Sequence, residues 1–418
     1  MSNRLLLLCL FLLSAAALRA QSTVLRQVIV LNGGAFGTDF TAVVGTYDPE
    51  TSSADTLDRI GTTSIQNLLV RGDDLYVLAA DSIVRYDLAT RTRVAATAFG
   101  GVSTLSAAYY PAGDQLLVGN WFGRTDSSLY VYDAQTLALD YVVAEIGPNV
   151  ADIMVVGDSA YVAQNQTSSS FSDTAGTLAV VDLAERTFVR SVALANEGNN
   201  VSRVYLRGDS LLVVGADGLG YYRPATGSYT HHPLAAPIVT TYGSVMQLVG
   251  DTLFAIDAAT TTIGALRADD GAVIEAAIVD TTLSRFVYDT LAGRFYVTYS
   301  DFVTRTHEGY VYDRTGDFLR VMPVGISPEA LALDYETVTS ARSPRTISLH
   351  LYPNPAATVV RWDTPARAVR LYDARGRQRR VVLHDARALD VSTCAPGVYW
   401  LEVETSEALL RGRVVVRP

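Results

Sequence analysis

The chain has 418 residues, 49% of them hydrophobic, which is enough to bury a large core. It carries 33 arginines and no lysine against 43 acidic residues. This acidic balance excludes a nonspecific nucleic-acid-binding protein, which needs basic patches, so we expect no nucleic-acid partner.

Residues 1–20 have the features of a signal peptide. Arg4 gives a positive start, Leu5 to Leu13 form an apolar run, and small residues lead to Ala20. The run is too short for a membrane-spanning helix, which needs about 20 residues. We therefore expect export to the periplasm and a mature chain that begins at Gln21. No later segment is predicted to span a membrane, and Cys394 is then the only cysteine, so no internal disulfide can form.

One unit of apolar strand, polar turn and second strand recurs along the acidic body of the chain. Its seven turns are spaced 39, 46, 49, 41, 45 and 45 residues apart and begin at Tyr47, Tyr86, Tyr132, Val181, Tyr222, Arg267 and Tyr312. Periods of about 40–50 residues with strand chemistry are typical of four-stranded propeller blades. The sequence predicts an all-β fold, with a seven-bladed β-propeller over residues 21–340.

A glycine-containing turn marks a second fixed place in six of the units. Glycine tolerates positive φ and aspartate bonds to nearby backbone, so we predict hairpins at Gly72-Asp73, Gly113-Asp114, Gly157-Asp158, Gly208-Asp209, Gly250-Asp251 and Ala292-Gly293. The first unit lacks this turn and the strand before it. The last unit has a surplus strand, Ala330 to Leu333. Because a closed ring leaves no sheet edge exposed, we expect this strand to pair beside Val28–Leu31 in the first blade.

Two stretches of the repeat resemble known exported propellers. "LLVGNWFGRTDSSLYVYDAQTLALDYVVAEIGPNVADIMVVGDSAYVAQ" resembles the YVTN-type, surface-layer-like propellers of bacteria, and "VIVLNGGAFGTDFTAVVGTYDPET" resembles propellers exported by Bacteroidetes. Some members of the narrower group are surface proteins that capture corrinoids. The resemblance implies a corrinoid as one candidate small-molecule ligand.

The last part of the chain differs in charge and in motifs. From Gln21 to Ser340 there are 18 arginines against 36 acids, whereas from Ala341 to Pro418 there are 13 arginines against 7 acids. We predict a linker at 341–347 and a small β-sandwich-like domain at 348–418. This domain resembles the type A C-terminal sorting domain of type IX secretion cargo. The matching residues include Pro353, Asn354, Pro355, Gly376, Asp390, Gly397 and Tyr399. The resemblance implies the type IX machinery as a partner and a secreted or outer-surface location.

No motif points to a metal, a cofactor or a catalytic centre. His231 and His232 are adjacent, so on a strand they point to opposite faces, and no metal-ligand spacing accompanies them. Arg71-Gly72-Asp73 and Arg207-Gly208-Asp209 match an adhesion tripeptide, but the repeat needs Gly-Asp at these turns for structural reasons. We predict no metal site, no cofactor and no catalytic residue.

Three long loops between second and third strands carry aromatic and arginine side chains. In a propeller such loops emerge at one end of the central channel, and decorated loops on a rigid scaffold commonly bind partners. The predicted binding residues are Trp121, Phe122, Arg124, Phe171, Tyr299, Phe302 and Arg305. The alternative is that these side chains only pack against neighbouring loops.

The main hypothesis is a secreted or cell-surface propeller that binds a small molecule or a surface protein. A propeller-type enzyme, such as a lyase or cyclase, is the second hypothesis, although the sequence has no paired acid–base residues. A structural or adhesive surface protein is the third. The sequence names neither the ligand nor the oligomeric state.

Overall fold

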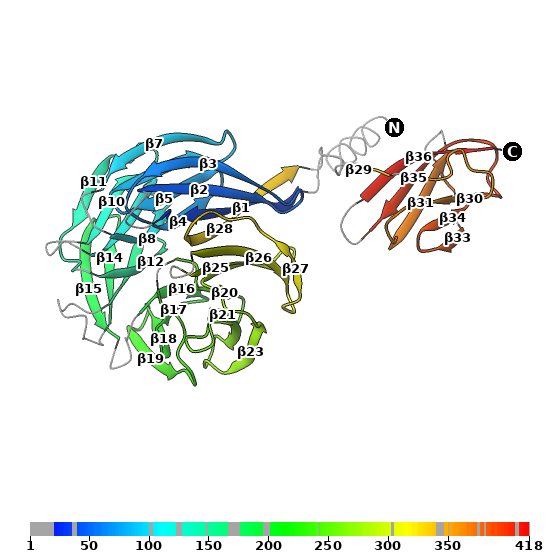
Figure 1. The fold of residues 1–418 in the computed structure, drawn as a ribbon. Coiled ribbons are helices and arrows are strands. Elements are labelled where there is room, and N and C mark those ends of the chain that lie inside the picture. Colours follow the sequence, from blue (N-terminus) through cyan, green and yellow to red (C-terminus); the bar gives the residue numbers. More distant parts are fainter. Residues whose placement is uncertain are drawn as a thin grey trace, which may run out of the picture. The chain divides into compact units, whose positions relative to one another are not determined.

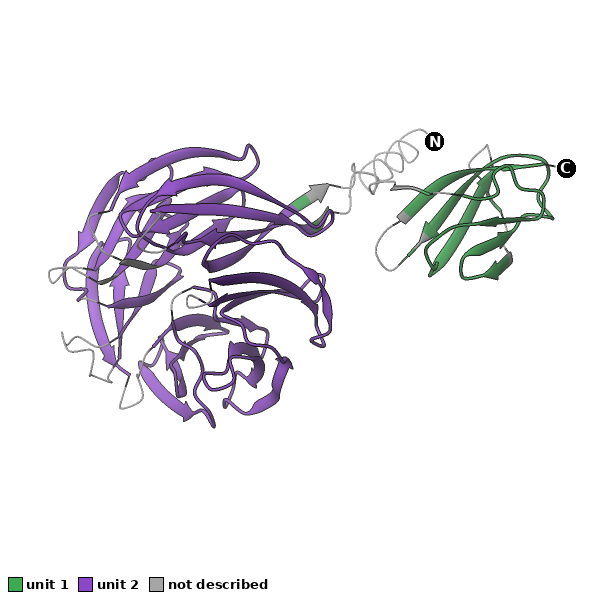
Figure 2. Cartoon of the chain, in the orientation of Figure 1, with its two compact units in different colours: residues 1–23, 337–418 green, residues 24–336 purple. Residues whose placement is uncertain are grey.

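The structure is a computed structural model that describes residues 21–35, 40–99, 103–122, 128–147, 149–165, 176–194, 201–241, 243–301, 305–339, 347–349, 351–373, 377–379, 382–405 and 409–417. The predicted signal peptide lies outside these residues. The described residues contain strands and turns but no helix, which confirms the all-β prediction. The chain divides into two compact units, Val24–Glu336 and a second unit that holds residues 337–418 together with residues 1–23 (Figure 2).

The larger unit contains seven four-stranded antiparallel sheets, the blades of a propeller (Figure 1). From the innermost strand outward, blade 1 consists of β28 (Pro328–Thr339), β1 (Gln21–Asn32), β2 (Thr41–Asp48) and β3 (Ser53–Gly61). Blade 2 consists of β4 (Ile65–Arg71), β5 (Asp74–Ala79), β6 (Ser82–Asp87) and β7 (Thr92–Ala98). Blade 3 consists of β8 (Ser103–Tyr110), β9 (Gln115–Phe122), β10 (Leu129–Asp133) and β11 (Leu139–Val143).

The remaining four blades follow in chain order. Blade 4 consists of β12 (Val150–Val156), β13 (Ser159–Gln164), β14 (Thr177–Asp182) and β15 (Thr187–Ala193). Blade 5 consists of β16 (Arg203–Arg207), β17 (Ser210–Val214), β18 (Gly218–Arg223) and β19 (Ser228–Pro233). Blade 6 consists of β20 (Met246–Val249), β21 (Thr252–Ile256), β22 (Ile263–Arg267) and β23 (Val273–Val279). Blade 7 consists of β24 (Arg285–Asp289), β25 (Arg294–Asp301), β26 (Thr306–Asp313) and β27 (Phe318–Val321).

Most copies of both repeated turns have the predicted chemistry. The glycine turns join the first and second strands of blades 2 to 7, and Gly72, Gly157 and Gly208 have φ of 55°, 57° and 60°. In blade 3 the residue at positive φ is Asp114, at 47°, and not Gly113. The aspartate turns join the third and fourth strands, where the carboxylate accepts backbone N–H groups of its own turn. Asp133 Oδ1, for example, accepts the amide of Thr136 at 2.7 Å. The Thr136 hydroxyl donates to the same oxygen at 2.7 Å, and this bond together with the backbone bonds favours the ionised form and lowers the pKa of Asp133.

The core lies between neighbouring blades. Side chains alternate along each strand, so each sheet presents one apolar face to the preceding blade and one to the next. Leu75 and Val77 of blade 2 pack with Ile29 and Leu31 of blade 1, and comparable clusters fill the other interfaces.

The two ends of the propeller unit meet in blade 1, as predicted. Strand β28 is hydrogen-bonded to β1, so the surplus strand completes the first sheet. A buried carboxylate joins the two strands, because Asp334 accepts bonds from Arg26 Nε at 2.7 Å and Gln27 Nε2 at 2.8 Å. Asp334 has no exposed surface.

The smaller unit is a two-layer β-sandwich. One layer has the order β29-β36-β35-β31-β32 and the other β30-β34-β33. Both layers contribute to one core around Trp362. The strands are β29 (Ile347–Ser348), β30 (Val359–Arg361), β31 (Ala368–Asp373), β32 (Gln378–Arg379), β33 (Val382–Asp385), β34 (Ala388–Asp390), β35 (Gly397–Glu404) and β36 (Leu409–Val416).

Candidate binding channel and sorting domain

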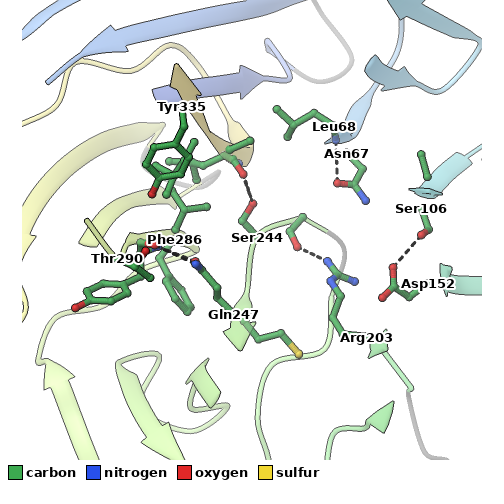
Figure 3. Close-up of a pocket in the computed structure, with 18 residues that line it drawn as sticks. Asn67, Leu68, Ser106, Asp152, Arg203, Ser244, Gln247, Phe286, Thr290 and Tyr335 are labelled. Carbon is green, nitrogen blue, oxygen red and sulfur yellow. Dashed lines mark hydrogen bonds between the residues drawn. The ribbon is translucent and has the colours of Figure 1, made fainter. Parts of the chain in front are cut away.

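A cavity of about 470 Å³ lies along the axis of the propeller (Figure 3). The innermost strand of every blade contributes to its wall, which includes Asn67, Ser106, Asp152, Arg203, Gln247, Phe286 and Tyr335. Since no single blade encloses this space, the cavity exists only when the ring is closed.

Asp152 connects three consecutive blades at the wall of the channel. Its Oδ1 accepts the Ser106 hydroxyl of blade 3 at 2.9 Å, and its Oδ2 accepts the Val204 amide of blade 5 at 2.8 Å. Burial raises the pKa of Asp152, and the nearby positive charge of Arg203 and the two bonds partly oppose that rise. The Arg203 guanidinium donates to the carbonyl oxygens of Ser202 and Gly243, which holds its position at the channel (Figure 3).

The wall across the channel is built around the closing strand. Ser244 Oγ donates to the Leu331 carbonyl at 2.7 Å and accepts the Leu331 amide at 2.9 Å. Arg285 Nε donates to the Glu329 carbonyl at 2.8 Å. These bonds tie the innermost strands of blades 7 and 1, and the segment that leads into blade 6, to one another.

Tyr335 completes the wall near the other end of the closing strand. Its hydroxyl donates to Asp289 Oδ1 at 2.9 Å, and Asp289 has no exposed surface. Burial and this carboxylate raise the pKa of the Tyr335 hydroxyl.

The predicted loop residues belong to loops whose roots lie at one end of this channel. Strand pairing places Phe122 opposite Ser103, Gln164 opposite Val150, and Thr298 opposite Arg285, and these partners lie at the start of innermost strands. A few residues further along the same innermost strands, Ser106, Asp152 and Phe286 line the cavity. We call this end of the channel, where the second-to-third loops and blade connections emerge, the loop-bearing end.

The seven predicted binding residues are described to different extents. Tyr299 is half-buried at the end part of β25, and Arg305 is exposed with φ of 57°. Trp121 and Phe122 are the last residues of β9, and the structure describes their backbone but not their side chains. Arg124, Phe171 and Phe302 lie outside the described residues altogether.

Sequence reasoning missed the residues that line the channel. Asp152, Arg203 and Gln247 lie on different innermost strands and become neighbours only through the ring. The available signal was a polar residue in an otherwise apolar first strand, as in Val150-Ala151-Asp152-Ile153-Met154. Without the register of each blade, that signal does not say which residues face the axis.

Other motifs lie away from the channel. His231 and His232 are on β19, the outermost strand of blade 5. Within the described residues, no group of three or more His, Cys, Asp or Glu is placed to hold a metal ion. Arg207, from one adhesion-like tripeptide, is paired with Asp251 at 2.7 Å and with Asp269 at 2.5 Å.

The Pro-Asn-Pro segment of the smaller unit covers the edge of the last strand. Asn354 Nδ2 donates to the Arg413 carbonyl at 2.6 Å and its Oδ1 accepts the Val415 amide at 2.9 Å. The peptide bonds before Pro353 and Pro355 are cis. Ala356 continues the pairing through its bonds to Val415 and Arg417.

The other predicted sorting residues shape turns and a strand start. Asp390 Oδ1 accepts the Ser392 amide at 2.8 Å, and Gly397 begins β35. The Tyr399 hydroxyl donates to the Ala395 carbonyl at 2.8 Å. Gly376 lies outside the described residues.

Comparison with known families identifies this smaller unit. Residues 350–417 match the model of a secretion system C-terminal sorting domain, the type IX sorting tail. The chain is therefore secreted, to the cell surface or beyond, and the tail engages the type IX machinery. In the described part of the chain, no helix has the length and apolarity to cross a membrane.

Solved structures share the fold at low sequence identity. The extracellular domain of a candidate one-component system from B. thetaiotaomicron has a TM-score of 0.58 at 12% identity, over 96% of this chain and 60% of that one. A functionally unknown protein from Desulfotomaculum acetoxidans has a TM-score of 0.53 at 11% identity, over 74% of this chain and 99% of that one. At sequence identities this low, the structural similarity shows a shared fold and nothing more. The search of curated proteins gave no match.

Proposed function

We propose that this chain is an exported β-propeller that binds a ligand at the loop-bearing end of its channel. In this proposal residues 1–20 are the signal peptide, residues 21–340 the binding propeller, residues 341–347 a linker and residues 348–418 the sorting domain. The YVTN-type resemblance of the blades supports a surface role.

The axial cavity is the observation that carries the proposal. Its volume of about 470 Å³ lies in the range of about 300–1,000 Å³ that is usual for small-molecule sites. Its wall combines apolar side chains with the hydrogen-bonding groups of Arg203, Asp152 and Gln247. Such a wall suits a compact ligand with polar groups that enters from the loop-bearing end.

The loops extend the site outward in this proposal. Trp121, Phe122, Phe171, Tyr299 and Phe302 would stack on a flat ligand, and Arg124 and Arg305 would orient its acceptor groups. A corrinoid, supported by the family resemblance alone, would lie across the mouth rather than inside the cavity. A surface protein would use the same aromatic loops.

Intrinsic fluorescence gives a direct test, because Trp121 is the only one of the three tryptophans that lies in the propeller. We would titrate the full chain with cyanocobalamin, then with a panel of sugars, amino acids and dipeptides. Binding at the loop-bearing end changes the Trp121 emission in a saturable way, and a Trp121→Phe chain gives the baseline for absorption by the ligand. A saturable signal that persists in Trp121→Phe would place the binding elsewhere.

Calorimetry of Trp121→Ala separates binding from packing. Loss of an aromatic anchor costs about 2 kcal/mol or more, which is about a 30-fold weaker Kd. The melting temperature should stay unchanged, because a strand end at a loop contributes little to the interblade core. A lower melting temperature with unchanged affinity would instead show that Trp121 only packs against its neighbours.

A further inference from the structure

The larger sheet of the sorting domain has one face that the domain itself leaves uncovered. Strand register aligns Tyr372 of β31 with Trp400 of β35, and Trp400 with Arg413 of β36. The next aligned row is Arg370, Glu402 and Arg411. Because side chains alternate along a strand, these two rows point to the same face of the sheet.

The opposite face of this sheet faces the domain core. Leu371, Leu401 and Val414 project there and are almost completely buried. They share one cluster with Val360 and Leu389 of the three-stranded sheet. The rows that contain Trp400 and Glu402 therefore lie on the outer surface of the sandwich.

The outer face is aromatic and basic. Trp400 is 52% exposed, an unusual position for the largest apolar side chain. The carboxylate of Glu402 is already bonded, since it pairs with Arg411 at 2.6 Å and lies 4.0 Å from Arg370. Arg413 is exposed and makes no ion pair with the described residues.

We propose that this face, centred on Trp400 and Arg413, is the surface by which an acidic protein segment of the export machinery recognises the tail. Trp400 supplies the apolar contact, and Arg413 supplies a guanidinium that can hold a carboxylate through two hydrogen bonds. With Arg370 and Arg411, the rows of this face hold three arginines against two glutamates, Glu402 and, one row further on, Glu404, so the balance of charge is positive. Tyr372 extends the aromatic surface along the same row.

Charge selects an acidic protein over other occupants. A second copy of the domain would place the same arginines opposite one another, which like-charge repulsion opposes. A membrane surface would attract the arginines, but among the described residues of this face only Trp400 and Val398 are exposed large apolar side chains, which is a small surface to enter the lipid. An acidic polypeptide satisfies both the tryptophan and the arginines.

Export of the full chain in a bacterium with a type IX system tests this surface. The variants are Trp400→Ser and Arg413→Glu, alone and together, with Trp400→Phe and Arg413→Lys as conservative changes. Matched controls are Leu383→Ser and Arg387→Glu, which alter exposed residues of the other layer. The readout is the fraction of protein in the medium or on the cell surface against the periplasmic fraction. A melting curve of each purified chain reports folding.

We expect the double variant to lose export by about tenfold or more with an unchanged melting temperature. The conservative variants and the controls should export normally. If the double variant is exported normally while deletion of residues 350–417 blocks export, the proposed recognition surface is wrong and the assignment of the sorting domain is retained. Self-association of the wild-type chain that Arg413→Glu abolishes would identify a second copy as the occupant. Sedimentation of the wild type with anionic phosphatidylglycerol vesicles, lost in the same variant, would identify a membrane.

Discussion

Removal of the buried carboxylate of Asp334 should weaken the closure of the propeller ring. Asp334 is on the closing strand β28, and its oxygens accept two bonds from Arg26, at 2.7 and 2.9 Å, and one from Gln27 at 2.8 Å. The side chain of Arg26 is 21% exposed and that of Asp334 is fully buried. Asp334→Ala would leave a largely buried guanidinium with only its contact to Asp73 at 2.9 Å.

The expected loss of unfolding free energy follows from this burial. Removal of one partner of a buried ion pair costs about 3–5 kcal/mol, and we take about 3 kcal/mol because Arg26 keeps Asp73 and some water. With an unfolding entropy of about 2.1 cal/mol/K per residue, the unit Val24–Glu336 should melt about 5 °C lower.

Thermal melts of three chains measure this effect. Asp55→Ala is the control, because Asp55 pairs with Arg91 at 2.8 Å on the surface, with side chains 73% and 39% exposed. A surface pair contributes about 0–1 kcal/mol, so the control should melt within about 2 °C of the wild type. If Asp334→Ala melts no lower than Asp55→Ala, the carboxylate does not hold the ring closed.

Three further changes have definite expected results. Gly243→Ala should destabilise the propeller strongly in a chemical-denaturation curve, because Gly243 has φ of 79° and an added Cβ would lie 2.1 Å from the Glu329 carbonyl. The control is Gly72→Ala, which has open space around its Cβ. Equal losses of unfolding free energy in the two variants would contradict the close approach at Gly243. Asp152→Asn should remove one pH dependence. Since the folded pKa of Asp152 is raised, the contribution of this group to wild-type stability falls as pH rises above about 4, and a difference in melting temperature between Asp152→Asn and wild type that stays constant with pH would refute this. Asn354→Ala should speed hydrogen exchange of the Val415 amide by exposing the edge of β36, and unchanged protection would show that the Pro-Asn-Pro segment does not need its amide.

The repeat made most of the fold predictable from the sequence. An Asp that accepts its own turn's amides, as Asp133 does, leaves a local signature in six of the seven units that does not depend on tertiary contacts, and in blade 5 Thr226 accepts the amide instead. The glycine turns at positive φ add a second signature at a fixed place. The ring closure could be predicted by counting the strands of each unit, because the first unit lacked one strand and the last unit had an additional strand, Ala330–Leu333.

The channel could not be predicted in the same way. Asp152 contacts Ser106, 46 residues earlier, and Val204, 52 residues later, and these partners are fixed by the register of three separate sheets. Sequence periodicity predicts that each innermost strand exists, but it does not predict which residue of that strand faces the axis. The aromatic residues of the loops, such as Trp121, stood out by composition instead, and their role in binding stays a prediction.

The location of binding is tested most directly by hydrogen–deuterium exchange of the full chain with and without the ligand that the fluorescence titration identifies. We expect protection at the loop-bearing end, in peptides that cover residues 120–128, 164–176 and 299–307 and the start of β8, β12 and β24. The glycine turns at the opposite end, such as Gly72-Asp73, should exchange at the same rate in both states. Protection confined to those turns or to the outermost strands would contradict a binding site at the loop-bearing end of the channel.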